Sequence, residues 1–483
     1  MNDATRILPL SRSRALPWSR WPAVFGAIWL SACAGLPPKP VPAVLPHSVP
    51  LMTEGVASPW PQREWWRGFN DEALNVLVTE GLAASVDLAG AQARVDAARA
   101  AVAAAVAAYG PQISGAAQAT RERISDHGLF PPELLGFNWY NQFDLGAQGS
   151  YLIGRPPRTR ALTRAAIDTR QAAEAERDAM ALALPNEIAR TYWGWQSDQA
   201  RLTLVQQMIV AAERALQISA ARVTANIART DDSQSAQLDL LKSRQHRSDL
   251  EISAQLRLIA LAALLGRTPE QLPVLTARPL PQLHTGLPEN ATIDLIARRA
   301  DIAAARWRVE ANARQRDFAR NSFYPDVSLK ALLGVTSRDL GVLLQAGSAA
   351  PSVAVAVHLP LFDSGTLKAN YARSQANLDD AVAHYRAAIL GAAREVNSQL
   401  AARANAEQQT ALREQEVTTA DALRAAAEAR ATSGITDDRP LLSATQQWLL
   451  RRELAVQSQS THLNAELELI QALGGGYLSD PQP

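Results

Sequence analysis

Four short stretches of the chain alternate between polar and apolar residues. The clearest is the second, in which Phe143 and Leu145 fall on one side and Gln142 and Asp144 on the other. A period of two is typical of a β-strand whose faces meet different surroundings. The four predicted strands are residues 112–123, 142–153, 326–336 and 352–361. Each half of the chain therefore contributes two strands of similar length.

The pattern changes to a helical period after Gly154 and Gly365. From these glycines to about Asn226 and Ser433, respectively, the chain contains few helix-breaking residues. Each half is therefore expected to contain one very long helix. At 1.5 Å per residue such a helix has a length of order 100 Å. Pro185 should bend or split the first long helix. Returning helices are predicted for residues 233–265 and 438–473.

The two halves follow one plan. Arg94-Val95-Asp96 and Arg308-Val309-Glu310 lie 214 positions apart, and Pro111 and Pro325 keep the same spacing. Near the ends of the long helices, Thr230-Asp231-Asp232 is paired with Thr436-Asp437-Asp438. A repeat of this kind indicates a tandem duplication.

This organisation divides the chain into consecutive segments. Each repeat is expected to hold a helix, two strands and long helices, in that order. The predicted segments are a signal peptide at 1–32, a Pro-rich lipid-anchored tether at 33–62, a first repeat at 63–270, a linker at 271–290, a second repeat at 291–476 and a C-terminal tail at 477–483.

The N-terminus has the layout of a secretory signal. Several arginines precede Trp21–Leu30, an apolar run that is too short to cross a bilayer. Leu30-Ser31-Ala32-Cys33 resembles a bacterial lipobox, whose cysteine carries lipid, including palmitate, after processing. The alternative is a chance cysteine in an ordinary cleavable signal. Ala34 stands where an Asp would mark inner-membrane retention, so the resemblance implies the outer membrane.

Composition removes several function classes. The chain has 48 Lys and Arg against 47 Asp and Glu, and this balance gives no broad footprint for nucleic acid. Its single cysteine excludes an internal disulfide, a Cys-based zinc site and an iron–sulfur cluster. The seven histidines show no metal-ligand spacing, and no catalytic constellation is present. We therefore expect no enzyme, no metal and no cofactor besides the covalent lipid on Cys33.

The Gly474-Gly475-Gly476 run has two interpretations. A phosphate-binding loop would need a preceding strand and a following Lys-Ser or Lys-Thr, and the sequence has neither. The run is therefore predicted to stop a helix.

The four strands suit a membrane wall. Strands of about ten residues match the span of a tilted strand through a bilayer. A soluble antiparallel sheet with one wet face is the alternative, which the period alone does not exclude. Four strands are too few to close a barrel, because the smallest membrane barrels have about eight. Three copies would supply about twelve.

Acidic residues mark the predicted turns between long helices. These are Asp231, Asp232, Asp437 and Asp438, with Arg439 beside the second pair. One interpretation is helix capping, in which one Asp of each pair accepts backbone N–H bonds. The other is a channel constriction, in which three copies bring about twelve carboxylates together and crowding disfavours their full ionisation. Arg229 and Arg439 are the nearest compensating cations, and no docking residues for a partner are assigned.

The assembled motifs resemble the TolC-like outer-membrane efflux protein family, in particular its OprM/NodT-type lipoprotein branch. They extend over nearly all of the chain that follows the signal. The motifs are Cys33, Trp65-Trp66-x-x-Phe69-x-Asp71-x-x-Leu74-x-x-Leu77, Asp87-Leu88-x-x-Ala91-x-Ala93-Arg94-Val95, Tyr324-Pro325, Leu361-Phe362-Asp363-x-Gly365 and Ala472-Leu473-Gly474-Gly475-Gly476-Tyr477. The chain departs from the family at Ala228-Arg229-Thr230 and at Ala431, near the two turns.

The resemblance implies a mainly α fold with a small β part. Three protomers would form one 12-stranded transmembrane β-barrel, continued by an α-barrel of coiled-coil helices across the periplasm. The implied function is the passive exit duct of a tripartite efflux system that exports several drugs. The chain would form a homotrimer. Its partners would be a periplasmic adaptor, a proton-driven inner-membrane transporter and outer-membrane lipid.

Two other functions remain open from the sequence. The same fold serves as the exit duct of type I protein secretion systems. A different class is a lipid-anchored periplasmic coiled-coil scaffold without a pore. It would contain a small sheet and would not form a trimeric barrel.

Overall fold

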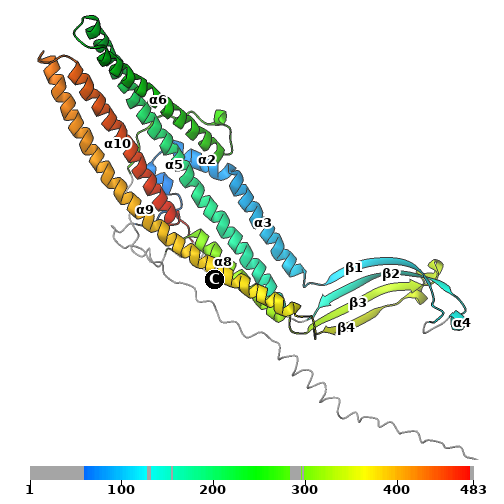
Figure 1. Cartoon of the computed structure of the whole chain (residues 1–483). Coiled ribbons are helices and arrows are strands. Elements are labelled where there is room, and N and C mark those ends of the chain that lie inside the picture. The colour runs from blue at the N-terminus through cyan, green and yellow to red at the C-terminus, as the bar shows by residue number, and fades with distance from the viewer. Residues whose placement is uncertain (1–58, 128–131, 154–155, 283–294, 296–297, 479–483) are drawn as a thin grey trace, which may run out of the picture. The chain divides into compact units, whose positions relative to one another are not determined.

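The computed structural model describes residues 59–127, 132–153, 156–282, 295 and 298–478. Cys33 and most of the predicted tether lie outside the described residues, as do 283–294 of the region that joins the two repeats. Figure 1 shows long helices and one small sheet. The described chain divides into two compact units, and each takes segments from both halves of the sequence.

The first unit contains Val106–Thr163 and Ala313–Asn377 and is built around a four-stranded sheet. All neighbouring strands are antiparallel, in the order β1-β2-β3-β4 (Figure 1). The strands are β1 (Gln112–Arg123), β2 (Trp139–Leu152), β3 (Asp326–Ser337) and β4 (Ser352–His358), with the short helix α4 (Pro132–Leu135) before β2. The four predicted strands are thus present.

One strand ends earlier than its pattern predicts. The alternation continues to Leu361, but β4 ends at His358. Pro360 follows two residues later, and proline has no N–H group to donate to a ladder. The apolar positions after His358 therefore lie outside the sheet.

The sheet has a polar face and an apolar face. The register places Gln118, Asp144 and Thr336 opposite one another, and Thr336 donates a hydrogen bond to Asp144 (Oγ1 to Oδ1, 2.6 Å). The apolar face is exposed within one chain. It includes Ile113, Leu145, Leu333, Val353, Val355 and Val357.

Two glycines let the sheet strands approach closely. Gly146 on β2 is paired with Gly334 on β3, on the polar face. A Cβ at Gly146 would lie 2.9 Å from the Gly334 Cα, which is closer than real Cβ atoms come. This position therefore requires a residue without a side chain.

The second unit contains the remaining described residues and is helical. Capping side chains fix several helix starts. Asp71 accepts the Leu74 N–H (3.0 Å) at the start of α2, for example. The helices of the chain, some of which extend into the first unit, are α2 (Glu72–Ala84), α3 (Val86–Ala107), α5 (Pro156–Thr224), α6 (Thr230–Leu264), α8 (Ala300–Asn321), α9 (Thr366–Thr432) and α10 (Arg439–Ala472).

Helix α5 is continuous through Pro185. Of the bend or split that was predicted at Pro185, the split is therefore wrong, and the bend stays a prediction. Proline removes one hydrogen bond of the helix, but α5 is held on both sides of it by tertiary packing, including the burial of Ala175 before it and of Ile188 after it.

The core of the helical unit lies where α5 packs on α2, α6 and α10. Its centre is aromatic, with Tyr192 and Trp193 rings 4.9 Å apart. Gly81 on α2 gives room to Ile188, whose Cδ1 would clash with an added Cβ. Trp66, Asp71, Leu74 and Leu77 are all buried here, which explains the spacing of the first sequence motif.

The glycine run ends the second returning helix. Helix α10 stops at Ala472, and Gly474, Gly475 and Gly476 all have positive φ angles. The predicted helix stop is confirmed. The run also passes close to other backbone, because a Cβ at Gly476 would lie 2.5 Å from the Arg63 amide nitrogen.

No single helix among the described residues is long and apolar enough to span a bilayer. Helices α2 and α3 meet the length and composition criteria only when they are taken together, with a bend of 41° between them.

Candidate functional site

The first predicted turn joins α5 to α6. Asn226 adopts a left-handed conformation (φ 58°), and the Ile227 N–H returns to the Arg222 carbonyl (3.0 Å), a common way to end a helix. Arg229 then forms an ion pair with Asp231 (Nε to Oδ1, 3.1 Å). Asp232 accepts the Arg229 N–H (3.3 Å) and so caps the start of α6.

The second turn joins α9 to α10 and repeats this geometry. Gly434 takes the left-handed position (φ 70°), and the Ile435 N–H returns to the Arg430 carbonyl (2.9 Å). Asp437 pairs with Arg439 (Oδ2 to Nε, 2.9 Å) and also accepts its backbone N–H (3.2 Å). Asp438 occupies the N-cap position of α10 without a side-chain capping bond.

The two turns therefore align differently from the sequence pairing. Asn226 corresponds to Gly434 and Ile227 to Ile435, both 208 positions apart, whereas the paired Thr-Asp-Asp motifs lie 206 apart. The predicted pairing of Asp231 with Asp437 is wrong by two residues. On the structural alignment, Arg229 corresponds to Asp437 and Asp231 to Arg439. Each turn thus holds an arginine–aspartate pair two residues apart, with the charges exchanged.

A third arginine connects the turns. Arg222, in the last turn of α5, lies 3.4 Å from Asp437 (Nη1 to Oδ2) and also donates to the Ile227 carbonyl (3.5 Å). Arg222 was not predicted from the sequence, because it lies inside a helix and 215 positions before its partner. Its position near a helix C-terminus, where cations are favoured, was the available signal.

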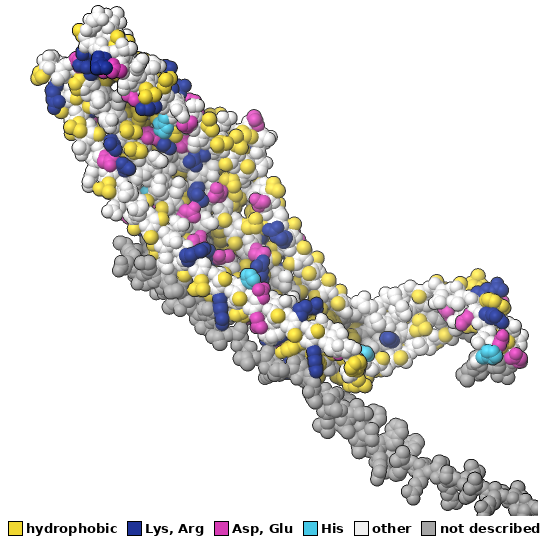
Figure 2. Space-filling view, in the orientation of Figure 1, with side chains coloured by type: hydrophobic (Ala, Val, Ile, Leu, Met, Phe, Trp, Pro, Cys, Tyr) yellow, Lys and Arg dark blue, Asp and Glu magenta, His cyan; other side chains and the backbone are white. Residues whose placement is uncertain are grey.

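The charged side chains of the turns are partly exposed to solvent. The Arg229 side chain is 84% exposed and Asp437 is 43% exposed, whereas Arg222 is 28% exposed. Figure 2 shows dark-blue and magenta side chains together at the end of the helical unit where these turns lie. Arg222 is therefore the most sheltered cation among these pairs.

These contacts change the acidity of one carboxyl group. The hydrogen bond from the Arg439 side chain lowers the pKa of Asp437 below its ordinary value of 3.8, and the charge of Arg222 acts in the same direction. The crowding predicted from the sequence would raise the pKa instead. It concerns several copies and stays a prediction.

The contacts of the acidic residues bear on the capping interpretation. One Asp of each pair, Asp232 and Asp437, accepts a backbone N–H as the capping interpretation predicts. Arg229 and Arg439 are the compensating cations that were expected. The constriction of a channel by Asp231, Asp232, Asp437, Asp438 and Arg439 stays a prediction.

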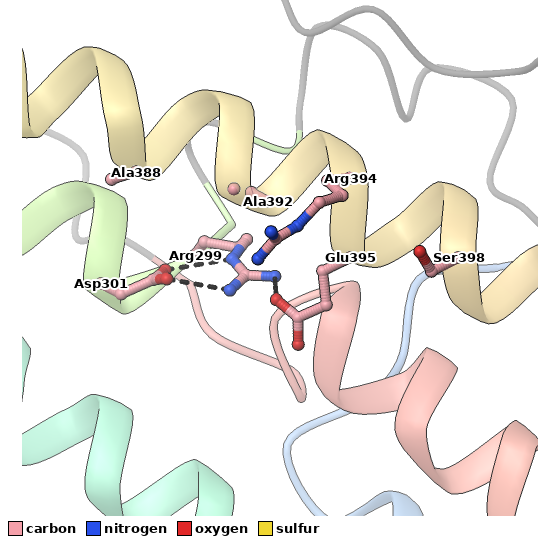
Figure 3. Close-up of a pocket in the computed structure, with 8 residues that line it drawn as sticks. Arg299, Asp301, Ala388, Ala392, Arg394, Glu395 and Ser398 are labelled. Atoms are coloured by element: carbon pink, nitrogen blue, oxygen red, sulfur yellow. Dashed lines mark hydrogen bonds and ion pairs between the residues drawn. The ribbon is translucent and has the colours of Figure 1, made fainter.

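A surface pocket of about 390 Å³ lies elsewhere on the helical unit, between Arg299 and α9 (Figure 3). Arg299 binds Asp301 (2.8 Å), Glu395 (2.9 Å) and the Ala472 carbonyl (2.7 Å). Its guanidinium is thus fully engaged and joins α8, α9 and the end of α10. Among the described residues, no group of three or more His, Cys, Asp or Glu could hold a metal ion.

Comparison with known proteins agrees with this geometry. The family model of the outer membrane efflux protein matches residues 77–267 and 293–475, one segment in each half. The chain belongs to the outer membrane efflux protein family. The predicted resemblance to TolC-like efflux proteins is confirmed, and the family is located in the outer membrane with a large helical extension into the periplasm.

Individual relatives extend over most of the chain. The multidrug resistance outer membrane protein MdtQ of Escherichia coli O157:H7 is 31% identical over 438 residues, which cover 86% of this chain and 89% of MdtQ. Among solved structures, the Campylobacter jejuni outer membrane channel CmeC has a TM-score of 0.82 at 20% sequence identity. The superposition covers 92% of this chain and 96% of the CmeC chain. The Vibrio cholerae outer membrane protein VceC has a TM-score of 0.75 at 28% identity, covering 86% and 100%.

Proposed function

We propose that this efflux protein is the exit duct of a tripartite efflux system. In this proposal three copies form a passive conduit from the periplasm to the exterior. The conduit closes at the turns α5–α6 and α9–α10. Its cargo includes several small toxic compounds, as the name of the relative MdtQ suggests.

The sheet carries this proposal. One of its faces is apolar and exposed, and a contiguous exposed apolar face marks contact with lipid or protein. Each of its edge strands, β1 and β4, has a neighbour on one side only among the described strands of the chain. Since about eight strands are the minimum for a membrane barrel, four must be pooled with those of other copies. Three copies give about twelve strands.

Helix α6 also supports association of copies. Leu240, Leu250 and Leu261 are buried within the protomer. Other apolar residues of α6 are exposed, in two groups whose members lie three or four positions apart. They are Leu238 and Leu241 and, eleven positions further on, Ile252, Leu256 and Ile259. A helix that is apolar on two sides suits a closed ring of helices, in which each helix contacts two neighbours.

The remaining partners follow from the passive character of a duct. A passive duct needs an inner-membrane transporter, driven by protons, to supply the energy. A periplasmic adaptor would stabilise the open turns, since a partner shifts a conformational equilibrium only by binding one state better. Lipid on Cys33 would anchor the N-terminal tether in the outer membrane.

The gate proposal rests on the ion pairs of the turns. Asp437, held by Arg439 and Arg222, and Asp231, held by Arg229, would line the closed end. The residues proposed for the constriction are Asp231, Asp232, Asp437, Asp438 and Arg439.

Export in cells tests the proposed function. The full chain is expressed in cells that lack their own efflux duct but retain an adaptor and a pump. Restored resistance to small toxic compounds is expected. Restored secretion of a protein cargo without resistance would favour the type I secretion duct instead. Neither effect from protein correctly located in the outer membrane would favour the poreless scaffold.

A further inference from the structure

Helices α5 and α10 come from different repeats and run side by side in the helical unit (Figure 1). Arginines of α5 form ion pairs with the α10 region at three heights. They are Arg190 with Glu468 (2.6 Å), Arg201 with Glu453 (2.5 Å) and Arg222 with Asp437 (3.4 Å). These pairs connect the α5–α6 hairpin of the first repeat to the α10 side of the second.

The middle pair differs from the other two in its burial. Glu453 is 3% exposed and Arg201 16% exposed, whereas both outer pairs are partly open to solvent. Separating a buried pair leaves an uncompensated charge away from water, and this is far more costly than separating an exposed pair. The middle pair is therefore the strongest ionic connection among the three.

Further contacts make the middle pair a junction of three helices. His246 of α6 lies 3.3 Å from the same Glu453 oxygen (Nε2 to Oε1). On α5, Asp198 binds Arg257 and Ser253 of α6 (both 2.8 Å) and lies 4.0 Å from Arg201. Arg201 and Glu453 thus connect α10 to the α5–α6 hairpin at the point where Asp198 holds α5 and α6 together.

The apolar packing changes at the same height. On the side of Arg190, the core that contains Ile188 and Tyr192 also includes Leu463 and Leu467 of α10. Asn186 adds a hydrogen bond to the Leu467 carbonyl (2.9 Å). On the side of the turns, the apolar cluster around Val205 and Ile209 contains residues of α5 and α6 alone.

From these observations we infer that the Arg201–Glu453 pair is the fulcrum about which the α5–α6 hairpin and α10 separate when the gate opens. This inference rests on the proposed function. The segment of α10 free to move extends from Arg439 to Glu453, about 21 Å at 1.5 Å per residue. Beyond the fulcrum the shared core keeps the helices together.

The inference is tested by combining variants and recording channels of the full-length protein in planar bilayers. Arg222→Ala releases the exposed pair and should raise the open probability. Glu453→Gln alone should stay close to wild type, because the pairs at the turns still hold. In the double variant Arg222→Ala/Glu453→Gln the separation extends further, so conductance should exceed that of Arg222→Ala, with open probability higher by roughly tenfold.

Glu468→Gln is the matched control, since it removes the same chemistry on the far side of the fulcrum. Adding it to Arg222→Ala should change nothing. A double variant Arg222→Ala/Glu453→Gln that conducts like Arg222→Ala would overturn the fulcrum. So would an equal gain from Glu468→Gln. Absence of channels from wild type and every variant would overturn the proposed function itself.

Distances between spin labels supply a readout that is independent of conductance. Labels at Gln217 and Ser443 lie on the side of the turns, and labels at Glu187 and Thr461 lie beyond the fulcrum. In Arg222→Ala only the first distance should increase. The first should increase further once Glu453→Gln is added, whereas the second should stay unchanged because the shared core still holds the helices there. A change of both distances in Arg222→Ala alone contradicts a fulcrum at this pair.

Discussion

Arg222 and Asp437 lie 3.4 Å apart although 215 positions separate them in the chain. Through this pair the last turn of α5 holds the segment that leads into α10. Arg439 binds the same carboxylate oxygen of Asp437 (2.9 Å). The two turns of one protomer are thus linked by a single aspartate that serves two arginines.

Removing this aspartate's charge should open the gate. We expect Asp437→Asn to raise the open probability in planar bilayers by up to about fivefold, because an exposed pair contributes modestly. The control is Asp239→Asn, which removes an exposed pair with Lys242 (3.4 Å) within α6. An equal response of both variants would remove the gate assignment from Asp437.

Acid should have the same effect as this substitution. The pKa of Asp437 lies below 3.8 in the paired arrangement, so its contribution is complete above that pH and is lost as the pH falls through the lowered value. We expect channel opening to increase only below about pH 3.8 in wild type, and a weaker acid response in Asp437→Asn. Opening with a midpoint above 3.8 would indicate that crowding of carboxylates dominates instead.

A glycine of α5 makes room for an ion pair between a half-exposed arginine and a buried aspartate. A Cβ at Gly194 would lie within contact of the Arg257 guanidinium, which crosses α5 to reach Asp198. Gly194→Ala should displace Arg257, leave Asp198 without it and destabilise the protein by about 3 kcal/mol. Gly391→Ala is the control, since nothing lies within 4 Å of its added Cβ. Thermal unfolding in detergent that shows equal effects for both would contradict this account.

Burial and the charge of Asp71 raise the pKa of Tyr192 to about 12. The phenol donates to Asp71 (Oη to Oδ2, 3.0 Å). Because the pKa is raised in the folded state, the stabilisation is complete below pH 10 and is lost as the pH rises towards 12. The absorbance of ionised tyrosine, compared between wild type and Tyr192→Phe, measures this pKa. Asp71→Asn should lower it without restoring the ordinary value, since burial persists.

The sequence was sufficient for elements whose pattern is local. Period two located the strands, and the helix stop at Gly474 follows from glycine alone. The end of β4 was misplaced because alternation continues past Pro360 although the ladder does not. The split at Pro185 was predicted wrongly for the opposite reason. Packing around Ile188 maintains a helix that the proline alone would break.

The candidate site was only partly accessible from sequence. The acidic residues of the turns and their neighbouring arginines were identifiable, because capping and ion pairing over two residues are local. The structural alignment of the two turns is set by the residue in the left-handed conformation, which is Asn226 in one turn and Gly434 in the other. Because these two residues differ, matching identical residues along the sequence did not align them. Arg222 and the Arg201–Glu453 pair depend on the antiparallel pairing of α5 with α10, which no local pattern encodes.

The mass of the purified full-length protein in mild detergent tests the central claim most directly. The account requires that the four strands of one chain be completed by those of other copies. Native mass spectrometry should therefore give three chains per particle, and those particles should conduct ions in a planar bilayer. Particles that hold a single chain and pass no ions would contradict the account.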